Sequence, residues 1–259
     1  MPTTTTSTLI SGSTGTALDR VRYFSRQLIT ADDMRAEQDY FREKLRRHNC
    51  MLHGWGVVYG CEVVPNSNSD HPWQVQVCPG YLITPRGDEI VIGQAVNFDL
   101  GGNWPQVEDP CKQESQRRAD VADSTVYLAA CYQECPTRPV RVHPIGCGCD
   151  EADCEYSRIR DSFTLLPLTQ LPAVKETTAE QTWKQEISNW LSSLRTNEPG
   201  RPPVAPCPTL PEDNCVVLAG ITLPTDKKTP IEGGNLADQR RALYSTAALE
   251  EIIRQLARL

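Results

Sequence analysis

The chain has 259 residues with a formal net charge of −7 and no run of more than two basic residues, which excludes the basic surface of a nucleic-acid-binding protein. Its start lacks the cationic and apolar regions of a signal peptide, and no apolar run approaches the roughly twenty residues that span a bilayer. We therefore expect a cytoplasmic protein with no nucleic-acid partner, long enough for one sizeable domain or two smaller ones.

The first residues of the chain predict an extended arm. Residues 1–20 are rich in threonine, serine and glycine, a composition that does not support a packed core of its own. Thr30 then begins a helix, because its hydroxyl can accept a hydrogen bond from the backbone N–H near Asp33, and the acidic residues that follow suit the positive end of the helix dipole.

This helix carries a mostly apolar stripe, and we expect the stripe to pack against the core of the protein. Its members recur at alternating steps of four and three residues, as on one face of a helix. They are Met34, Gln38, Phe41, Leu45, His48 and Leu52. Gly54 and Gly56 should end the helix and, with Gly60, let the chain turn sharply into a strand.

The middle of the chain predicts strands. Residues 73–77 alternate apolar and polar side chains, and residues 81–84 and 89–92 flank a Pro-Arg-Gly-Asp turn as in a hairpin. Residues 96–100 and 125–132 add two strands on either side of a polar loop or short helix over 106–123. Twenty prolines and sixteen glycines also favour short strands and long connections.

The last third mixes helices, a strand and a proline-rich stretch. A strand over 162–168 precedes a helix that Thr178 should cap, and the face of that helix that carries Trp183 and Trp190 should pack on the core or on another subunit. Six prolines between residues 197 and 214 favour a long loop, a strand follows over 215–223, and a helix closes the chain. Leu249, Ile252, Ile253 and Leu256 mark its apolar face.

Together these patterns predict an α+β fold, with the N-terminal helix packed on a mainly antiparallel β-sandwich or barrel-like core. Additional C-terminal helices and long proline-rich loops complete it. We divide the chain into an arm (1–20), a helix and β-rich domain with a cysteine-rich loop at 131–154 (21–172), and a C-terminal region (173–259) that packs on the same core.

The strongest candidate for chemistry is a cluster of cysteines with His143 among them. Thiolates and an imidazole can form a tetrahedral zinc site, whose binding energy would order a loop rich in glycine and proline. The spacing C-x3-C followed by C-x-C-x4-C differs from the paired C-x2-C of zinc ribbons, so buried free thiols or a disulfide are the alternative. A bound zinc ion would be structural. The candidate ligands are Cys131, Cys135, Cys147, Cys149 and Cys154.

Acid–base chemistry has a weaker basis. His48 and His53 flank the end of the first helix, where an imidazole suits the negative end of the dipole, so a structural role is expected. The chain has no G-x-S-x-G elbow, Walker A loop, dinucleotide-binding glycine turn or H-E-x-x-H helix. We therefore expect no enzymatic activity and no cofactor besides a structural zinc ion.

Two stretches around the first helix resemble a signature of structural proteins from phage-tail-like contractile injection systems. Residues 23–34 read YFSRQLITADDM, and residues 52–63 read LHGWGVVYGCEV. Residues 77–81 with 88–90 are similar to a hairpin of phage baseplate and tail-fibre proteins. Arg26 stands where the family usually has glycine, and Cys61 where it has leucine.

The resemblance implies a non-enzymatic structural subunit at or around the baseplate of a sheath-driven particle, in a peripheral, crown-like or adaptor layer. Its partners would be baseplate, sheath or tube proteins together with symmetric copies of itself, and it would meet a membrane only through the assembly. Two alternatives stay open. A receptor- or glycan-binding tail module should show exposed aromatics in a cleft, and a zinc-dependent enzyme needs three ligands, an open coordination position and a nearby base.

Overall fold

The computed structural model describes residues 18–101, 125–141, 154–172, 177–194, 200–207 and 214–256. Most of the expected arm, the expected loop over 106–123, and the positions of His143, Cys147 and Cys149 lie outside these ranges. The first part of the chain forms α1 (Ala31–His48), the π-helical turn η1 (Asn49–His53), β1 (Gly56–Gly60), β2 (Val63–Pro65), β3 (Gln74–Val77), β4 (Gly80–Ile83), β5 (Glu89–Ile92) and β6 (Val96–Asp99). The remainder forms β7 (Thr125–Arg141), β8 (Cys154–Leu168), α2 (Thr178–Ser193), β9 (Cys215–Thr222), the 3-10 turn η2 (Gly233–Asn235), β10 (Leu236–Asp238) and α3 (Thr246–Leu256).

The strands form three antiparallel sheets, with orders β1-β4-β5, β2-β3-β6 and β10-β9-β7-β8. The predicted hairpin is present as β4 and β5, and the backbone N–H of Thr84 donates to the carbonyl of Asp88 across its turn at 2.9 Å. The prediction of an α+β fold with an antiparallel, sheet-rich core is confirmed, and the sheets do not close into a barrel.

One hydrophobic cluster joins the three sheets. Leu82 of β4, Val75 of β3 and Leu128 of β7 are all fully buried in it. Strand β9 comes from the C-terminal region, lies between β10 and β7, and adds the buried Val216 and Ile221 to the same cluster. The C-terminal region therefore supplies part of the core rather than a separate one.

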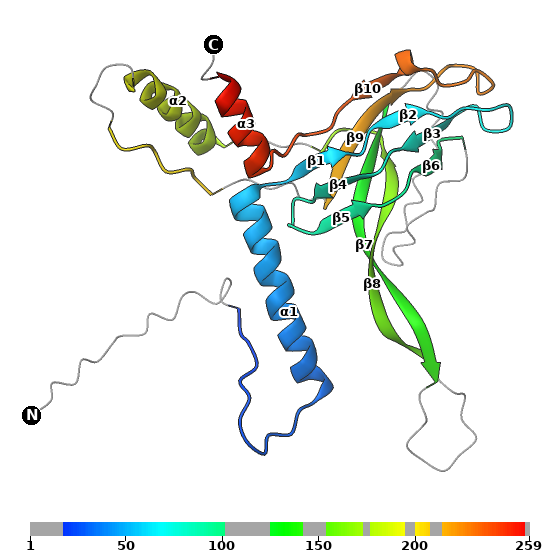
Figure 1. Cartoon of the computed structure of the whole chain (residues 1–259). Helices are drawn as coiled ribbons and strands as arrows, with labels where there is room; N and C mark the ends of the chain where they lie inside the picture. Colours follow the sequence, from blue (N-terminus) through cyan, green and yellow to red (C-terminus); the bar gives the residue numbers. More distant parts are fainter. Residues whose placement is uncertain are drawn as a thin grey trace, which may run out of the picture.

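Strands β7 and β8 form a hairpin that is much longer than the sequence indicates. The expected strands at 125–132 and 162–168 extend to Arg141 and back to Cys154, and the hairpin projects beyond the sheets (Figure 1). The prediction of a cysteine-rich loop from residue 131 onward is wrong over this part. Pairing with β9 ends at Cys131, so beyond it β7 has one open edge, where the missing N–H of a proline costs no hydrogen bond. Because backbone N–H groups alternate between the two edges of a strand, this edge accounts for one of Pro136 and Pro139.

Helix α1 projects from the sheets rather than lying on them (Figure 1). None of its residues is buried, and Met34, Phe41 and Leu45 keep 51%, 61% and 53% of their surface exposed. The expectation that the apolar stripe packs against the core is therefore wrong. The base of the helix is what holds it to the sheets, through polar contacts described below.

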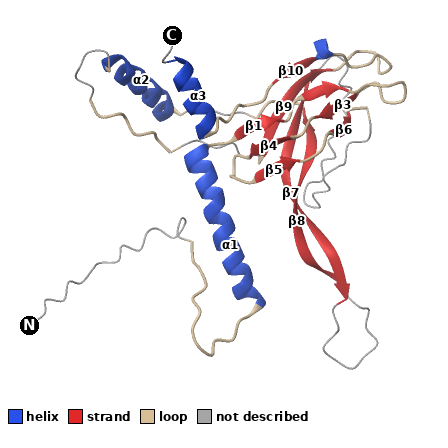
Figure 2. Ribbon diagram, in the orientation of Figure 1, coloured by secondary structure: helices blue, strands red, loops and turns tan. Residues whose placement is uncertain are grey.

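The two other helices also keep apolar side chains exposed. Thr177, rather than the expected Thr178, caps α2, because its hydroxyl accepts a hydrogen bond from the N–H of Glu180. Helix α3 forms where predicted, with Ile253 and Leu256 both more than 60% exposed. Figure 2 shows the three helices gathered to one side of the strands. Each of them presents apolar surface that the sheets leave uncovered.

Candidate functional site

The start of α1 is closed by a reciprocal pair of hydrogen bonds. The Thr30 hydroxyl accepts from the Asp33 N–H at 3.2 Å, and the Asp33 carboxylate accepts from the Thr30 N–H at 2.8 Å. The hydrogen bonds that the Thr30 N–H and hydroxyl donate to the Asp33 carboxylate hold the pKa of Asp33 below its usual range. The predicted cap is therefore confirmed, and the helix begins at a defined residue although it is surrounded by solvent.

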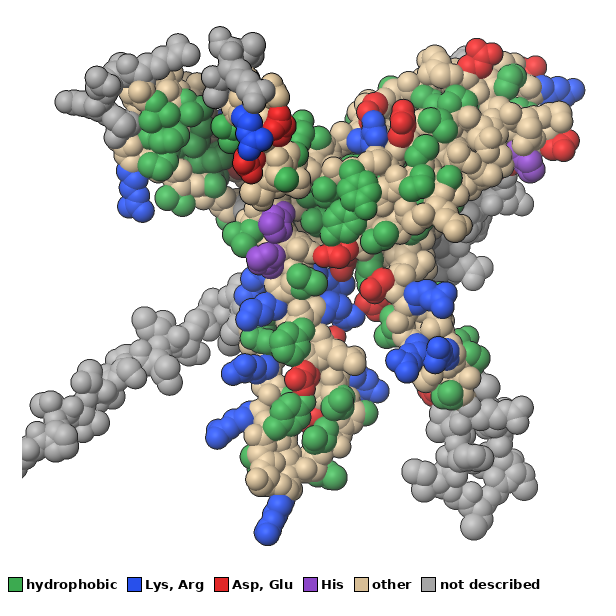
Figure 3. Space-filling model, viewed as in Figure 1, with side chains coloured by type: hydrophobic (Ala, Val, Ile, Leu, Met, Phe, Trp, Pro, Cys, Tyr) green, Lys and Arg blue, Asp and Glu red, His purple; other side chains and the backbone are tan. Residues whose placement is uncertain are grey.

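Exposed apolar side chains lead into and along this helix, with Gln38 and His48 between them in the stripe. The segment before it contributes Phe24 and Leu28, which are 65% and 84% exposed, and Leu52 in η1 is 71% exposed. Figure 3 shows apolar side chains gathered along α1 between its basic ones. Large exposed apolar surfaces on soluble proteins mark sites of interaction, and exposed apolar side chains recur on one face of α1. We call the run from Met34 to Leu52 at steps of four and three the α1 stripe.

The turn that joins α1 to β1 depends on glycine. Gly54 and Gly56 have φ values of +83° and +138°, as the sequence predicted for a sharp turn into the sheet, and Gly60, at the far end of β1, has φ at +64°. A Cβ on Gly56 would lie 2.4 Å from the Arg241 carbonyl oxygen, and one on Gly60 would lie 2.1 Å from that of Pro79. Backbone segments therefore approach this turn too closely for any side chain.

A segment near the C-terminus fastens the same turn. Val57 donates its N–H to the Arg241 carbonyl at 2.7 Å, and Leu243 donates to the Val57 carbonyl at 2.8 Å. The Arg241 guanidinium lies 4.4 Å from the centre of the Trp55 ring, a cation–π contact. Sequence patterns gave no sign of this contact, because the two segments are separated by more than 180 residues.

The base of α1 is fastened to the sheets by charged and polar side chains. Arg46 pairs with Asp88 in the β4–β5 turn, and the side-chain amide of Asn49 donates to the Gly87 carbonyl at 2.9 Å. Arg42 donates to Glu134 of β7 at 2.6 Å. Asn49 and Asp88 are both buried, so these contacts fix the helix firmly at one end.

The candidate zinc ligands do not converge in the described part of the chain. Cys131 forms a disulfide with Cys215 directly opposite on β9. Cys135 lies four residues further along β7, roughly 13 Å away in an extended strand, whereas thiolates on one zinc ion lie within about 4 Å of each other. The backbone of Cys154 pairs with that of Arg141, six residues beyond Cys135 along β7. A single site that uses all three is therefore excluded.

No group of three or more metal-ligating side chains occurs among the described residues. Cys147 and Cys149 lie outside the described residues, so a metal site that includes them stays a prediction. In the core, burial raises the pKa of the Cys61 thiol to about 11, which leaves this thiol protonated and unreactive. The disulfide partner Cys215 was missing from the predicted set because it lies 84 residues from Cys131.

The histidines form no catalytic arrangement in the described structure. The rings of His48 and His53 contact each other edge to face, with centroids 5.2 Å apart. They lie at the C-terminal end of α1, whereas Asp32 is in its first turn. His71 pairs with Asp99 at 2.8 Å on the surface. These contacts fit the structural role expected of His48 and His53.

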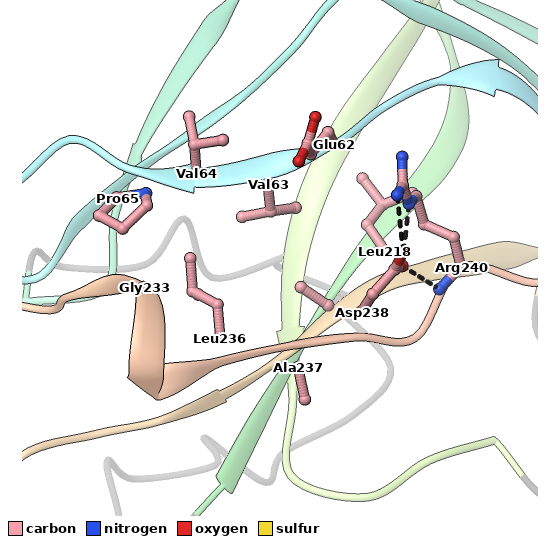
Figure 4. A pocket seen from close by; sticks show the side chains of 11 residues that line it. Glu62, Val63, Val64, Pro65, Leu218, Gly233, Leu236, Ala237, Asp238 and Arg240 are labelled. Atoms are coloured by element: carbon pink, nitrogen blue, oxygen red, sulfur yellow. Dashed lines mark hydrogen bonds and ion pairs between the residues drawn. The ribbon is translucent and has the colours of Figure 1, made fainter.

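A shallow groove of about 270 Å³ lies between the edge strands β2 and β10. Val63 and Leu236 line it, and an ion pair between Arg240 and Asp238, 2.6 Å long, lies at one end (Figure 4). Arg240 donates three hydrogen bonds to Asp238, from its backbone N–H, Nε and Nη2, and these lower the pKa of Asp238 to about 2. No aromatic side chain lines the groove, so it lacks the stacking surface expected of a glycan site.

No protein-family model matches the chain, and no curated protein is similar to it in sequence. Among the helices that the structure describes, none combines the length and the apolar character needed to cross a membrane.

Proposed function

We propose that this chain is a non-enzymatic structural subunit of a contractile injection system, located at or around the baseplate. The residues that resemble this family form one physical unit: the cap at Thr30, helix α1, the glycine turn and strand β1. The unit presents a helix outward from a fixed base. It would act in the cytoplasm as part of an assembled particle, either free or docked at a membrane.

The observation that carries this proposal is the exposed α1 stripe. A helix that served only to complete the core would bury its apolar face, whereas α1 buries none of its residues. Burying an apolar side chain stabilises a protein by about 1.5–3 kcal/mol, so a neighbouring subunit that covers the stripe gains substantial free energy. Baseplate, sheath or tube proteins and further copies of this chain are the partners that such a particle offers.

The proposal is tested by isolating particles from the native host with an affinity tag on this chain. Sheath and tube proteins should copurify with it, sediment at the mass of a particle, and be lost together when the particle is dissociated. The double variant Leu45→Glu, Phe41→Glu should not be incorporated into the particles. Recovery of the wild-type chain as a lone monomer, with no sheath or tube protein, contradicts the proposal.

A receptor- or glycan-binding tail module is supported by a different observation. Tyr59 and Tyr81 stack with ring centroids 5.9 Å apart on β1 and β4, and Tyr59 is 61% exposed. Aromatic faces of this kind can hold a sugar ring. Glycan binding that is lost in Tyr59→Ala but kept in Tyr156→Ala, an exposed tyrosine on β8, would favour this second function.

A further inference from the structure

The α1 stripe has the spacing of a coiled-coil seam. Its alternating steps of four and three residues average 3.5 per turn, the period that keeps one seam facing a second helix. In the seven-residue repeat, Ala31, Gln38 and Leu45 occupy position a, and Met34, Phe41 and His48 occupy position d. The seam continues into η1 through Leu52, which is 71% exposed.

The contacts at the base of α1 leave this seam accessible. Arg46, which binds Asp88, is at position b, roughly 110° around the helix from the seam at 100° per residue. Arg42, which binds Glu134, is at position e, at the edge of the seam rather than on it. A second helix can therefore approach the seam without displacing the sheets. It would also support α1, because most of the stability of helices in proteins comes from packing of an apolar face, and α1 has no buried residue.

We propose that α1 packs in parallel and in register against α1 of a second copy of this chain. The proposal rests on the proposed function, since it names the contact that symmetric copies in an assembly would share. In a parallel pair, Gln38 faces Gln38 of the second copy, and the two amides can hydrogen-bond to each other. In an antiparallel pair, position a faces position d, so Gln38 would face Phe41 in one register and lose a partner there, or face His48 in the register one heptad further along.

The charges beside the seam favour the same orientation. Glu37 is at position g and Arg42, which also pairs with Asp39 and Glu134 of its own chain, is at position e. A parallel pair brings position g of one helix next to position e of the other, five residues further along. Opposite charges therefore meet. An antiparallel pair brings e next to e, which places Arg35 of one copy near Arg42 of the other. Two arginines on neighbouring helices repel each other, and this repulsion opposes association of an antiparallel pair.

The test measures the mass of the full-length chain by light scattering across a range of concentrations. The wild type should associate, and Leu45→Glu should raise the dissociation constant by about 100-fold or more, because a carboxylate would be buried in the seam. Ala36→Glu adds the same charge on the opposite face of α1 and should leave the constant unchanged. Circular dichroism should show equal folding of all three, since both positions are exposed in the single chain.

A cross-link reports the orientation. With the photoreactive residue benzoylphenylalanine in place of Met34, the linked dimer should join position 34 to residues near 34 of the second copy. Links to residues near Leu52 would mean an antiparallel pair and would overturn the proposal, as would a wild type that stays monomeric at its highest soluble concentration. Equal weakening by Leu45→Glu and Ala36→Glu would overturn it too.

These results are distinct from a failure of the proposed function. A monomeric chain that still copurifies with sheath and tube proteins would overturn only the parallel pairing. A chain that associates through the seam but is absent from injection particles would support the pairing and contradict the proposed function.

Discussion

Replacing Gly87 by alanine should loosen the attachment of α1 to the sheets. Gly87 lies in the β4–β5 turn with φ at +88°, and a Cβ there would be 2.1 Å from the carbonyl oxygen of Arg46 at the end of α1. Both atoms belong to, or sit directly on, the backbone, so a side-chain rotation cannot relieve the overlap. The turn and the helix would have to move apart.

The cost has two parts. A left-handed backbone conformation costs a residue with a Cβ about 1–2 kcal/mol relative to glycine. Moving the turn also separates the Gly87 carbonyl from Asn49, which is only 5% exposed, and a buried amide without its partner costs about 1–3 kcal/mol. We therefore expect Gly87→Ala to lower the free energy of unfolding by about 2–5 kcal/mol.

Urea denaturation followed by tryptophan fluorescence measures this change. Gly93→Ala is the matched control, because no atom lies within 4 Å of its Cβ position, and we expect it to change stability by less than about 1 kcal/mol. Hydrogen exchange of the α1 amides should also speed up in Gly87→Ala only. Equal midpoints for the two variants would refute the close contact between this turn and the base of α1.

Three further predictions concern other parts of the fold. The cysteines of the Cys131–Cys215 disulfide are 84 residues apart, so its reduction should lower the free energy of unfolding by about 4 kcal/mol. The stability of Cys215→Ser should not change with reductant. A wild-type melting curve that reductant leaves unchanged would contradict the presence of this bond. The pKa of Asp238 is lowered to about 2 by hydrogen bonds from Arg240, so its carboxylate stabilises the fold above about pH 4 and loses this effect as the pH falls toward 2. The contribution is small because the Arg240–Asp238 pair is exposed. Asp238→Asn should remove the fall in stability between about pH 4 and about pH 2 that this carboxylate causes. Wild type and variant that lose stability in parallel over this range would contradict the prediction. Arg26 has φ at +69°, so Arg26→Gly should melt at a higher temperature than Arg26→Ala, and the reverse order would show that the turn is unstrained.

Local patterns in the sequence predicted much of the fold. The cap at Thr30, the hairpin of β4 and β5, and the apolar repeat of α3 are each specified by residues close together in the chain, and all three form. The apolar repeat of α1 likewise predicted the helix correctly. It did not predict what covers the stripe, because periodicity identifies an apolar face and gives no information about its partner.

The errors have physical causes in long-range contacts. Proline residues in β7 suggested a loop, yet the open edge beyond Cys131 can hold a proline without the loss of a hydrogen bond. The pairing of Cys131 with Cys215 depends on β9 lying next to β7, which no spacing within residues 131–154 could indicate. The segment around Arg241 that fastens the glycine turn was missed for the same reason.

If the proposed function holds, the exposed α1 stripe becomes an interface inside an assembled injection particle. Cryo-electron microscopy of particles purified through this chain would show that interface. We expect density for this chain at or around the baseplate, with Phe41 and Leu45 covered by neighbouring subunits. Particles in which the α1 stripe faces solvent, or in which this chain has no density, would contradict it.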